Sequence, residues 1–265
     1  MTEQILRSSL TVLALDELDP LGVDAFVTTR DGGVSKGPYA SLNLALHVGD
    51  EVDDVLVNRT RLAQAAGCEL SDLVFMDQIH GARVASVGNG ERGRGAFEAD
   101  HALSATDAVV TTTPELSLVV LVADCAPVVL VDPEHRVLGV AHAGWRGVAA
   151  DVLGATVRAM EALGAHARSL RCVIGPTISP ARYEVGDEVL DALARELGSL
   201  EGLVDLSKER PHLDVAQAAR RSLLHAGVPD DAVTITAERS DDEAFFSARR
   251  GRPCGRFGLV ACLVG

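Results

Sequence analysis

The clearest pattern along the chain is a series of short apolar runs, rich in Val and Leu, in its middle third. The runs at 118–122, 128–131 and 137–141 contain no charged residue and lie close to Pro or Gly. Short apolar runs without alternation are typical of strands that are buried on both faces. Further strands are expected at 23–29, 73–76, 83–87, 107–113, 170–174, 232–236 and 257–263.

Apolar positions spaced three or four residues apart predict helices between these strands. The segments with this spacing, each closed by a glycine one or two residues later, are 52–66, 148–163, 186–197 and 214–225. Asp50 is expected to cap the first of them. Strands and helices do not alternate as a simple βαβ series requires, and no repeat or linker interrupts the chain. The pattern therefore favours one domain over residues 1–265.

Composition narrows the classes of partner. The 265 residues are 47% hydrophobic, enough for a large core, and the net charge of −14 opposes binding to nucleic acid or to an anionic membrane surface. No apolar stretch is long enough to span a bilayer, and the N-terminus has no features of a secretory signal. The five cysteines are odd in number and form no CxxC, which favours free thiols and a cytoplasmic location.

Three side chains that can bind a metal lie at the ends of expected strands. His80 and Cys125 each follow a strand, and His142 ends one. Two imidazoles and a thiolate suit zinc, and three protein ligands leave the fourth position for water or substrate, as in catalytic zinc sites. A second interpretation makes Cys125 a nucleophile with His142 as its base. In a third, the thiol is an inert core residue and the histidines are unrelated to it.

Polar residues near the same strand ends are candidates for substrate contacts. Arg146 lies in GWRG, where a strand passes into a helix, and a guanidinium beside the free amides of a helix start suits a phosphate or carboxylate. Asp124, next to Cys125, is a candidate acid/base or supporting group. The further candidates, for which a solvated surface role is the alternative, are Arg30, Asn43, Gln78 and Arg249.

Six sequence blocks, in order, carry a resemblance to a known family. They are TTRDGGVSKGPYASLNLALHVGD, FMDQIHG, VADCAPVVLVDP, GVAHAGWRG, IGPTISPARYEVGDEV and FFSARRG. The set resembles the YfiH-like family, also called the laccase-type polyphenol oxidoreductase or peptidoglycan editing factor family. The resemblance implies an α+β fold, namely a single layered α/β/β/α domain with mixed sheets. It also implies a zinc ion bound by His80, Cys125 and His142. It also implies phosphate or substrate contacts from Arg30, Arg146 and Arg249.

The activity that the resemblance implies is on purine nucleosides with phosphate: phosphorolysis of adenosine, inosine, guanosine and methylthioadenosine, and deamination of adenosine. Zinc in such a site lowers the pKa of its bound water to roughly 7, which suits attack on C6 of adenine. Phosphate oriented by Arg146 would attack C1′ of the ribose. The chain departs from the family at Ala248, where Tyr is common, and near Ala237, where a Cys-Thr pair is common. These departures bear on substrate preference.

Three other functions remain open at this point. A copper-dependent polyphenol oxidase, or laccase, needs a trinuclear cluster on paired histidines, whereas the chain has eight histidines and no HxH; a single copper ion remains an alternative to zinc. A hydrolase that edits peptidoglycan precursors would use the same zinc and arginines on an amide. A non-enzymatic metal-binding partner protein would need a fourth protein ligand. The candidates for that ligand are His47, His101, His135 and Asp124.

Overall fold

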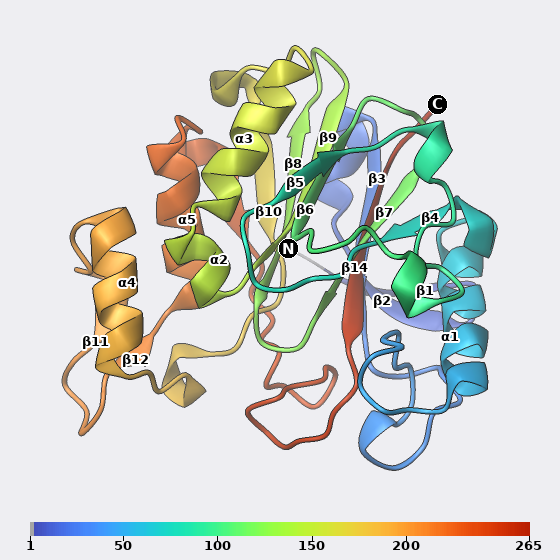
Figure 1. Ribbon diagram of the computed structural model, residues 1–265, viewed down its shortest axis with the longest axis horizontal. Helices are drawn as coiled ribbons and strands as arrows, with labels where there is room; N and C mark the ends of the chain where they lie inside the picture. The colour runs from blue at the N-terminus through green and yellow to red at the C-terminus, as the bar shows by residue number, and fades with distance from the viewer. Residues whose placement is uncertain (1–2) are drawn as a thin grey trace.

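The structure is a computed structural model that describes residues 3–265. These residues form two six-stranded sheets and a small two-stranded ribbon (Figure 1). The first sheet has the order β1 (Gln4–Arg7), β2 (Leu10–Ala14), β3 (Val23–Thr28), β14 (Phe257–Leu263), β7 (Ser117–Val122) and β4 (Leu73–Phe75). The second has the order β13 (Val233–Ile235), β10 (Arg171–Ile174), β8 (Ala126–Asp132), β9 (Val137–Ala143), β6 (Ala108–Thr111) and β5 (Val84–Ser86). The ribbon pairs β11 (Val204–Asp205) with β12 (His212–Leu213).

Both large sheets are mixed. β4 runs parallel to β7, β5 parallel to β6, and β13 parallel to β10, whereas the other neighbouring strands are antiparallel. This arrangement confirms the expected α+β domain with mixed sheets. It also confirms that the chain is not a βαβ series, because most neighbours in each sheet are antiparallel.

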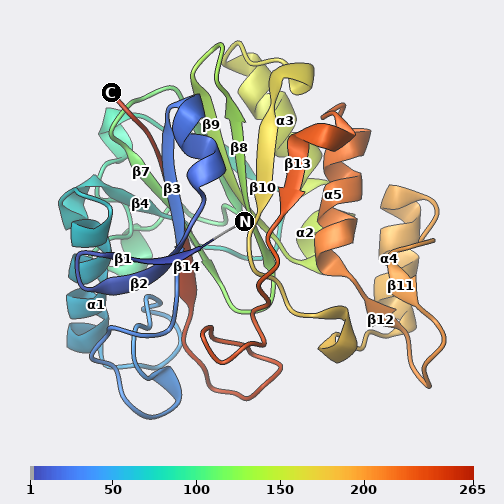
Figure 2. The ribbon, with the colours of Figure 1, turned by 180° about the vertical axis from the view of Figure 1, so that it is seen from behind.

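The two sheets pack face to face, and helices cover their outer faces (Figures 1 and 2). Val120 of the first sheet and Val129 and Val140 of the second belong to the apolar layer between the sheets. Helix α1 (Val52–Ala65) covers the first sheet, and the helices of the other half cover the second. Every residue of β7, β8 and β9 is buried, as their continuous apolar runs predict, because each of these strands is covered on both faces.

The helices on the side of the second sheet are α2 (Trp145–Ala149), α3 (Val152–Ala162) and α5 (Val215–His225), and α4 (Asp187–Leu197) packs against α2 and α5 farther from the sheet. The prediction of one helix over 148–163 is wrong. The helix is interrupted at Asp151, whose backbone has a left-handed φ of 62° and whose side chain caps α3 by accepting a hydrogen bond from the Gly154 amide. The apolar spacing continues across the break because both helices pack on the same sheet, so periodicity alone does not reveal it.

Two local expectations near the N-terminus also change. Asp50 does not cap α1: Glu51 holds the N-cap position, and the Asp50 carboxylate accepts a hydrogen bond from the Asn43 amide. Strands β1 and β2 were not predicted. They form a hairpin at the edge of the first sheet, where β1 is only half covered and its apolar pattern is correspondingly weak.

The structure bears on two predictions from the sequence, one about membrane spans and one about the cysteines. Within residues 3–265, no helix combines the length and the apolar character that a membrane span needs. All five cysteines are free thiols, as their spacing predicts.

Candidate metal centre and active site

Two of the three predicted metal ligands lie where the chain passes from one sheet to the other. β4 and β7 are parallel neighbours in the first sheet, and the segments that follow them enter the second sheet as β5 and β8. His80 lies on the first of these crossings, and Asp124 and Cys125 lie on the second. His142 lies in β9, opposite Pro127 at the start of β8. Asp124 and Cys125 therefore interrupt the apolar pattern where the chain changes sheet, whereas His142 interrupts it inside β9 of the second sheet.

The geometry of His80, Cys125 and His142 fits one metal ion. Each offers one ligand atom, and these atoms lie within 4.8 Å of one another. Zinc bond lengths in a tetrahedral site place such nitrogen and sulfur atoms about 3.4–3.6 Å apart, so shifts of about 1 Å complete the site. Within residues 3–265 no other group of this kind is found, and none of the four candidates for a fourth ligand joins it. Three protein ligands are typical of a catalytic rather than a structural site.

Asp107, which was not predicted, holds both histidines in place. One oxygen of its fully buried carboxylate lies 2.9 Å from Nδ1 of His142 and accepts the backbone amide of His80 at 2.9 Å. The other oxygen accepts the amides of Ile79 and Gly81 at 3.2 and 2.7 Å. The bond to Nδ1 leaves the other ring nitrogen of His142 to face the metal site. The sequence signal that could have identified Asp107 is its position directly before the buried strand β6.

The charges at the site support thiolate ligation. Burial alone raises the pKa of the Cys125 thiol, but the charge of His142 and hydrogen bonds from His142 and His80 outweigh it and lower that pKa from its ordinary 9.0 to about 6. Burial lowers the pKa of His142, but the Cys125 thiolate and Asp107 raise it overall from 6.5 to about 9. A thiolate is the form that binds metal.

These ligands open onto a cavity of about 350 Å³, within the range of small-molecule sites. Its wall is formed by His47, Gln78, His80, Leu121, Val122, Ala123, Asp124, Cys125, His142, Trp145, Arg146, Tyr183, Ala248, Arg249, Arg252 and Arg256. The Arg146 guanidinium lies over the Trp145 ring at 4.2 Å, and that of Arg249 lies over Tyr183 at 4.8 Å. Guanidiniums outnumber carboxylates in this wall although the chain as a whole is acidic, so the cavity favours anions.

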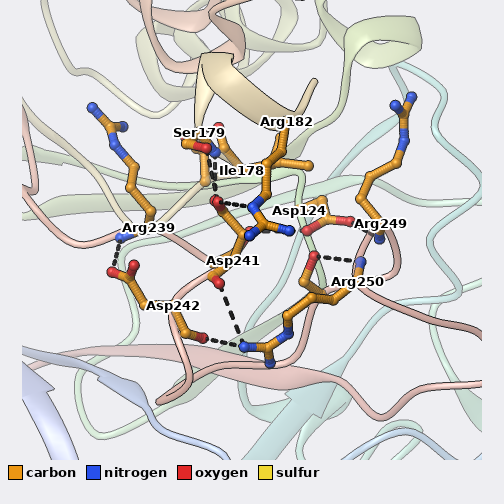
Figure 3. Close-up of polar contacts among 12 residues, drawn as sticks. Asp124, Ile178, Ser179, Arg182, Arg239, Asp241, Asp242, Arg249 and Arg250 are labelled. Carbon is orange, nitrogen blue, oxygen red and sulfur yellow. Dashed lines mark hydrogen bonds and ion pairs between the residues drawn. The ribbon is translucent and has the colours of Figure 1, made fainter. Parts of the chain in front are cut away.

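Asp124 connects the metal site to the loop that carries Arg249. Its backbone has a φ of 91°, and its carboxylate oxygens accept the Ser240 hydroxyl at 3.0 Å and the Arg249 amide at 2.9 Å. Figure 3 shows this carboxylate beside a wider polar network: Asp241 accepts the amide and hydroxyl of Ser179, and Arg250 donates to the carbonyls of Asp241 and Asp242. These hydrogen bonds hold the loop that carries Arg249 at the cavity wall.

The structure brings together some of the predicted contact residues and not others. Gln78 lines the cavity, where its amide group exchanges two hydrogen bonds with the backbone of Leu121. Arg30 lies outside the cavity wall: its guanidinium donates to the Ala40 carbonyl and lies over the Phe246 ring at 4.9 Å.

Asn43 also lies outside the cavity wall. It is fully buried and bonds to the backbone of Ala45, to Asp50 and to the amide of Arg256. Its amide is therefore used to hold the loop together.

Sequence reasoning did not single out several residues of the wall. They are Trp145, Tyr183, Arg252 and Arg256; His47 was considered only as a metal ligand. The available signal was the segment 249–256, RRGRPCGR, which concentrates four arginines in an acidic chain.

The family model described as multi-copper polyphenol oxidoreductase laccase matches residues 24–264. The chain belongs to this family. Solved structures of the YfiH and YlmD proteins share its fold: hypothetical protein YfiH of Bacillus licheniformis has a TM-score of 0.92 and 36% identity over 98% of each chain. YlmD of Geobacillus stearothermophilus has a TM-score of 0.93 and 34% identity over 100% of each chain.

Two curated relatives show that this YfiH family contains enzymes. Purine nucleoside phosphorylase YlmD of G. stearothermophilus is 39% identical over 249 residues, which cover 92% of this chain and 90% of the relative. Adenosine deaminase RL5, from an unknown prokaryotic organism, is 36% identical over 233 residues, covering 86% and 89%. The relatives' names describe reactions of nucleosides, whereas the family description names a copper oxidase.

Proposed function

We propose that the chain is a zinc-dependent purine nucleoside enzyme that catalyses phosphorolysis of adenosine, inosine, guanosine and methylthioadenosine, and deamination of adenosine. The observation that carries the proposal is the His-Cys-His group at the wall of a cavity lined by arginines. A metal centre suits hydrolytic deamination, and guanidiniums suit the phosphate that phosphorolysis consumes. The names of the two enzyme relatives agree with both reactions.

His80, Cys125 and His142 would hold the metal, which when bound supplies Lewis-acid chemistry at the cavity wall. Asp107 keeps the His142 ring in the tautomer that presents its other nitrogen. The donor set suits zinc, and a single copper ion is the alternative that metal analysis distinguishes.

Arg146 and Arg249 are the residues we assign to phosphate. Both guanidiniums lie against aromatic rings, which hold them at the cavity wall. Helix α2 is only five residues long, so the Arg146 side chain, more than the helix start, provides the anion contact. In phosphorolysis, a phosphate oxygen forms a bond to C1′ of the ribose while the C1′–N9 bond breaks and the purine leaves with that electron pair.

Trp145 and Tyr183 give the wall an aromatic surface on which a purine can stack. Asp124 is assigned a positioning role, because both of its oxygens already accept hydrogen bonds. Through the amide of Arg249, it holds that arginine in the cavity wall. We assign Gln78, which lines the cavity from the other crossing of the chain, to a contact with the substrate.

The test is an adenosine assay with and without inorganic phosphate, with products separated by chromatography and bound metal measured. We expect adenine only with phosphate and inosine as the deamination product, with hypoxanthine only where phosphate allows that inosine to be phosphorolysed. Cys125→Ala is expected to lose the metal and both activities. Cys262→Ala is the matched control, because Cys262 lies in β14 outside the cavity wall and should keep both.

Unchanged adenosine with a full complement of metal would contradict the proposal. Full activity and metal content in Cys125→Ala would remove the site. Several copper ions per chain, with oxidation of a phenol, would support the oxidase that the family description names.

A further inference from the structure

The cavity at the metal site continues into a second one. This second cavity, of about 490 Å³, is lined by His47, Val48, Ala248, Arg252, Pro253, Cys254 and Arg256. Four of these residues, namely His47, Ala248, Arg252 and Arg256, also line the first cavity. The two therefore form one cleft. Ala248 is the only one of the four shared residues with a small apolar side chain.

The second cavity is positively charged. Within the described part of the chain no carboxylate lines it, whereas two guanidiniums and an imidazole do. The Arg256 guanidinium is held by the carbonyls of Cys254 and Gly255 at 2.9 and 3.0 Å. Burial and the charges of Arg256 and Arg59 lower the pKa of His47, which reports the positive potential there. Two guanidiniums with no carboxylate in the lining attract an anion, to which the His47 imidazole adds a ring N–H donor.

Arg252 differs from the other arginines of the cleft. Its side chain is exposed, and among residues 3–265 it has no hydrogen-bond, ion-pair or aromatic partner. Arg249 and Arg256, by contrast, donate to backbone carbonyls. Arg252 is therefore free to bind a ligand without breaking an existing contact.

The proposed reactions do not use these charges. A nucleoside is neutral, and the one inorganic phosphate is assigned to Arg146 and Arg249. We infer that Arg252, Arg256 and His47 form a second anion subsite that binds the phosphate group of a purine nucleoside 5′-monophosphate. The inference rests on the proposed function, because it extends the same cleft from the nucleoside to its phosphate ester.

The experiment measures binding of inosine and of inosine 5′-monophosphate to the metal-loaded protein by calorimetry in phosphate-free buffer. Inosine has no amino group to lose and is not phosphorolysed without phosphate, so binding is measured without turnover. A charge-assisted hydrogen bond predicts about tenfold tighter binding of the monophosphate. Arg252→Gln should bring the ratio of the two dissociation constants toward one, and Arg252→Lys should retain part of it.

Two further variants locate the phosphate group. Arg146→Gln should keep the ratio, because Arg146 is assigned to the other phosphate. Arg168→Gln, a surface change with the same loss of charge outside the cleft, should keep it as well. A ratio that is lost in Arg146→Gln and kept in Arg252→Gln would place the ester phosphate at the first site and overturn the inference.

Titration with inorganic phosphate alone separates the two sources of the phosphate group. Phosphate binding that depends on Arg252, with equal affinity for inosine and its monophosphate, would overturn the nucleotide assignment. If inosine binds and the monophosphate gains nothing, the subsite fails and the proposed function stands. If neither binds and adenosine is also unchanged in the activity assay, the proposed function itself fails.

Discussion

Asp107 is the most informative residue to change, because one carboxylate holds two proposed metal ligands. Its oxygens receive four hydrogen bonds: those of His80 and His142 at one oxygen, and those of Ile79 and Gly81 at the other. In Asp107→Asn only one oxygen remains, so either orientation of the amide loses two of these bonds. Hydrogen bonds to charged groups contribute about 1.5–3 kcal/mol each, so the free energy of unfolding should fall by about 3 kcal/mol or more.

The same change should weaken metal binding. If the amide nitrogen faces Nδ1 of His142, the ring proton must move to the other nitrogen, which is then unable to bind metal. If it faces Ile79 and Gly81, the segment that carries His80 loses two of the three hydrogen bonds that hold it. Loss of such a supporting group costs about 10–100-fold in metal affinity, measured here by competition with a chromophoric zinc chelator.

Asp132→Asn is the matched control. The Asp132 carboxylate is also fully buried, and it accepts the amides of Glu134, His135 and His166 and contacts Nδ1 of His135. It lies at the opposite end of β8 from Cys125, so it should lose similar stability while zinc affinity stays unchanged. Equal zinc affinity in Asp107→Asn and in the unmodified protein would refute the reasoning.

Three further predictions concern stability and the metal site. Burial raises the pKa of Asp132, but hydrogen bonds from His166 and His135 outweigh it and lower the pKa below its ordinary 3.8. As the pH falls, the Asp132 carboxylate therefore takes up a proton in the unfolded chain before it does so in the folded chain. The stability that this group contributes is complete above about pH 5, falls as the pH drops through the folded pKa, and should be absent in Asp132→Asn. If the pH dependence of urea unfolding is the same in Asp132→Asn as in the unmodified protein, the prediction is wrong. A Cβ on Gly144 would lie 2.7 Å from Cys125 Sγ and 3.2 Å from His80 Cδ2. Gly144→Ala should therefore reduce zinc affinity and lower the free energy of unfolding by about 1–3 kcal/mol. Unchanged zinc affinity in this variant would show that the ligands move freely. Asp151→Ala should lower the melting temperature by about 2–4 °C, because it removes the cap of α3, which contributes about 1 kcal/mol. Asp151→Asn should keep most of this stability, because its side-chain oxygen can still accept the hydrogen bond. Equal melting temperatures of the two variants would exclude a capping role.

Much of the fold and of the site was predictable because both depend on local signals. The apolar runs of β7, β8 and β9 predict buried strands, and the polar residues that interrupt them are Asp124, Cys125 and His142. The errors have physical causes. The break at Asp151 leaves no trace in a pattern set by one shared sheet, and edge strand β1 buries too little to show a pattern.

By itself, the sequence determined which segments are buried strands and which side chains are chemically able to bind a metal, because burial and donor chemistry are properties of single residues and their near neighbours. Only the tertiary structure decided which of them meet. The two crossings between the sheets bring His80 to Cys125 and His142 and place Asp107 behind them. The fold likewise turns Asn43 into the core and gathers Arg252 and Arg256 around the cleft. Distances between residues far apart in the chain depend on how the two sheets stack, and no short stretch of sequence contains that information.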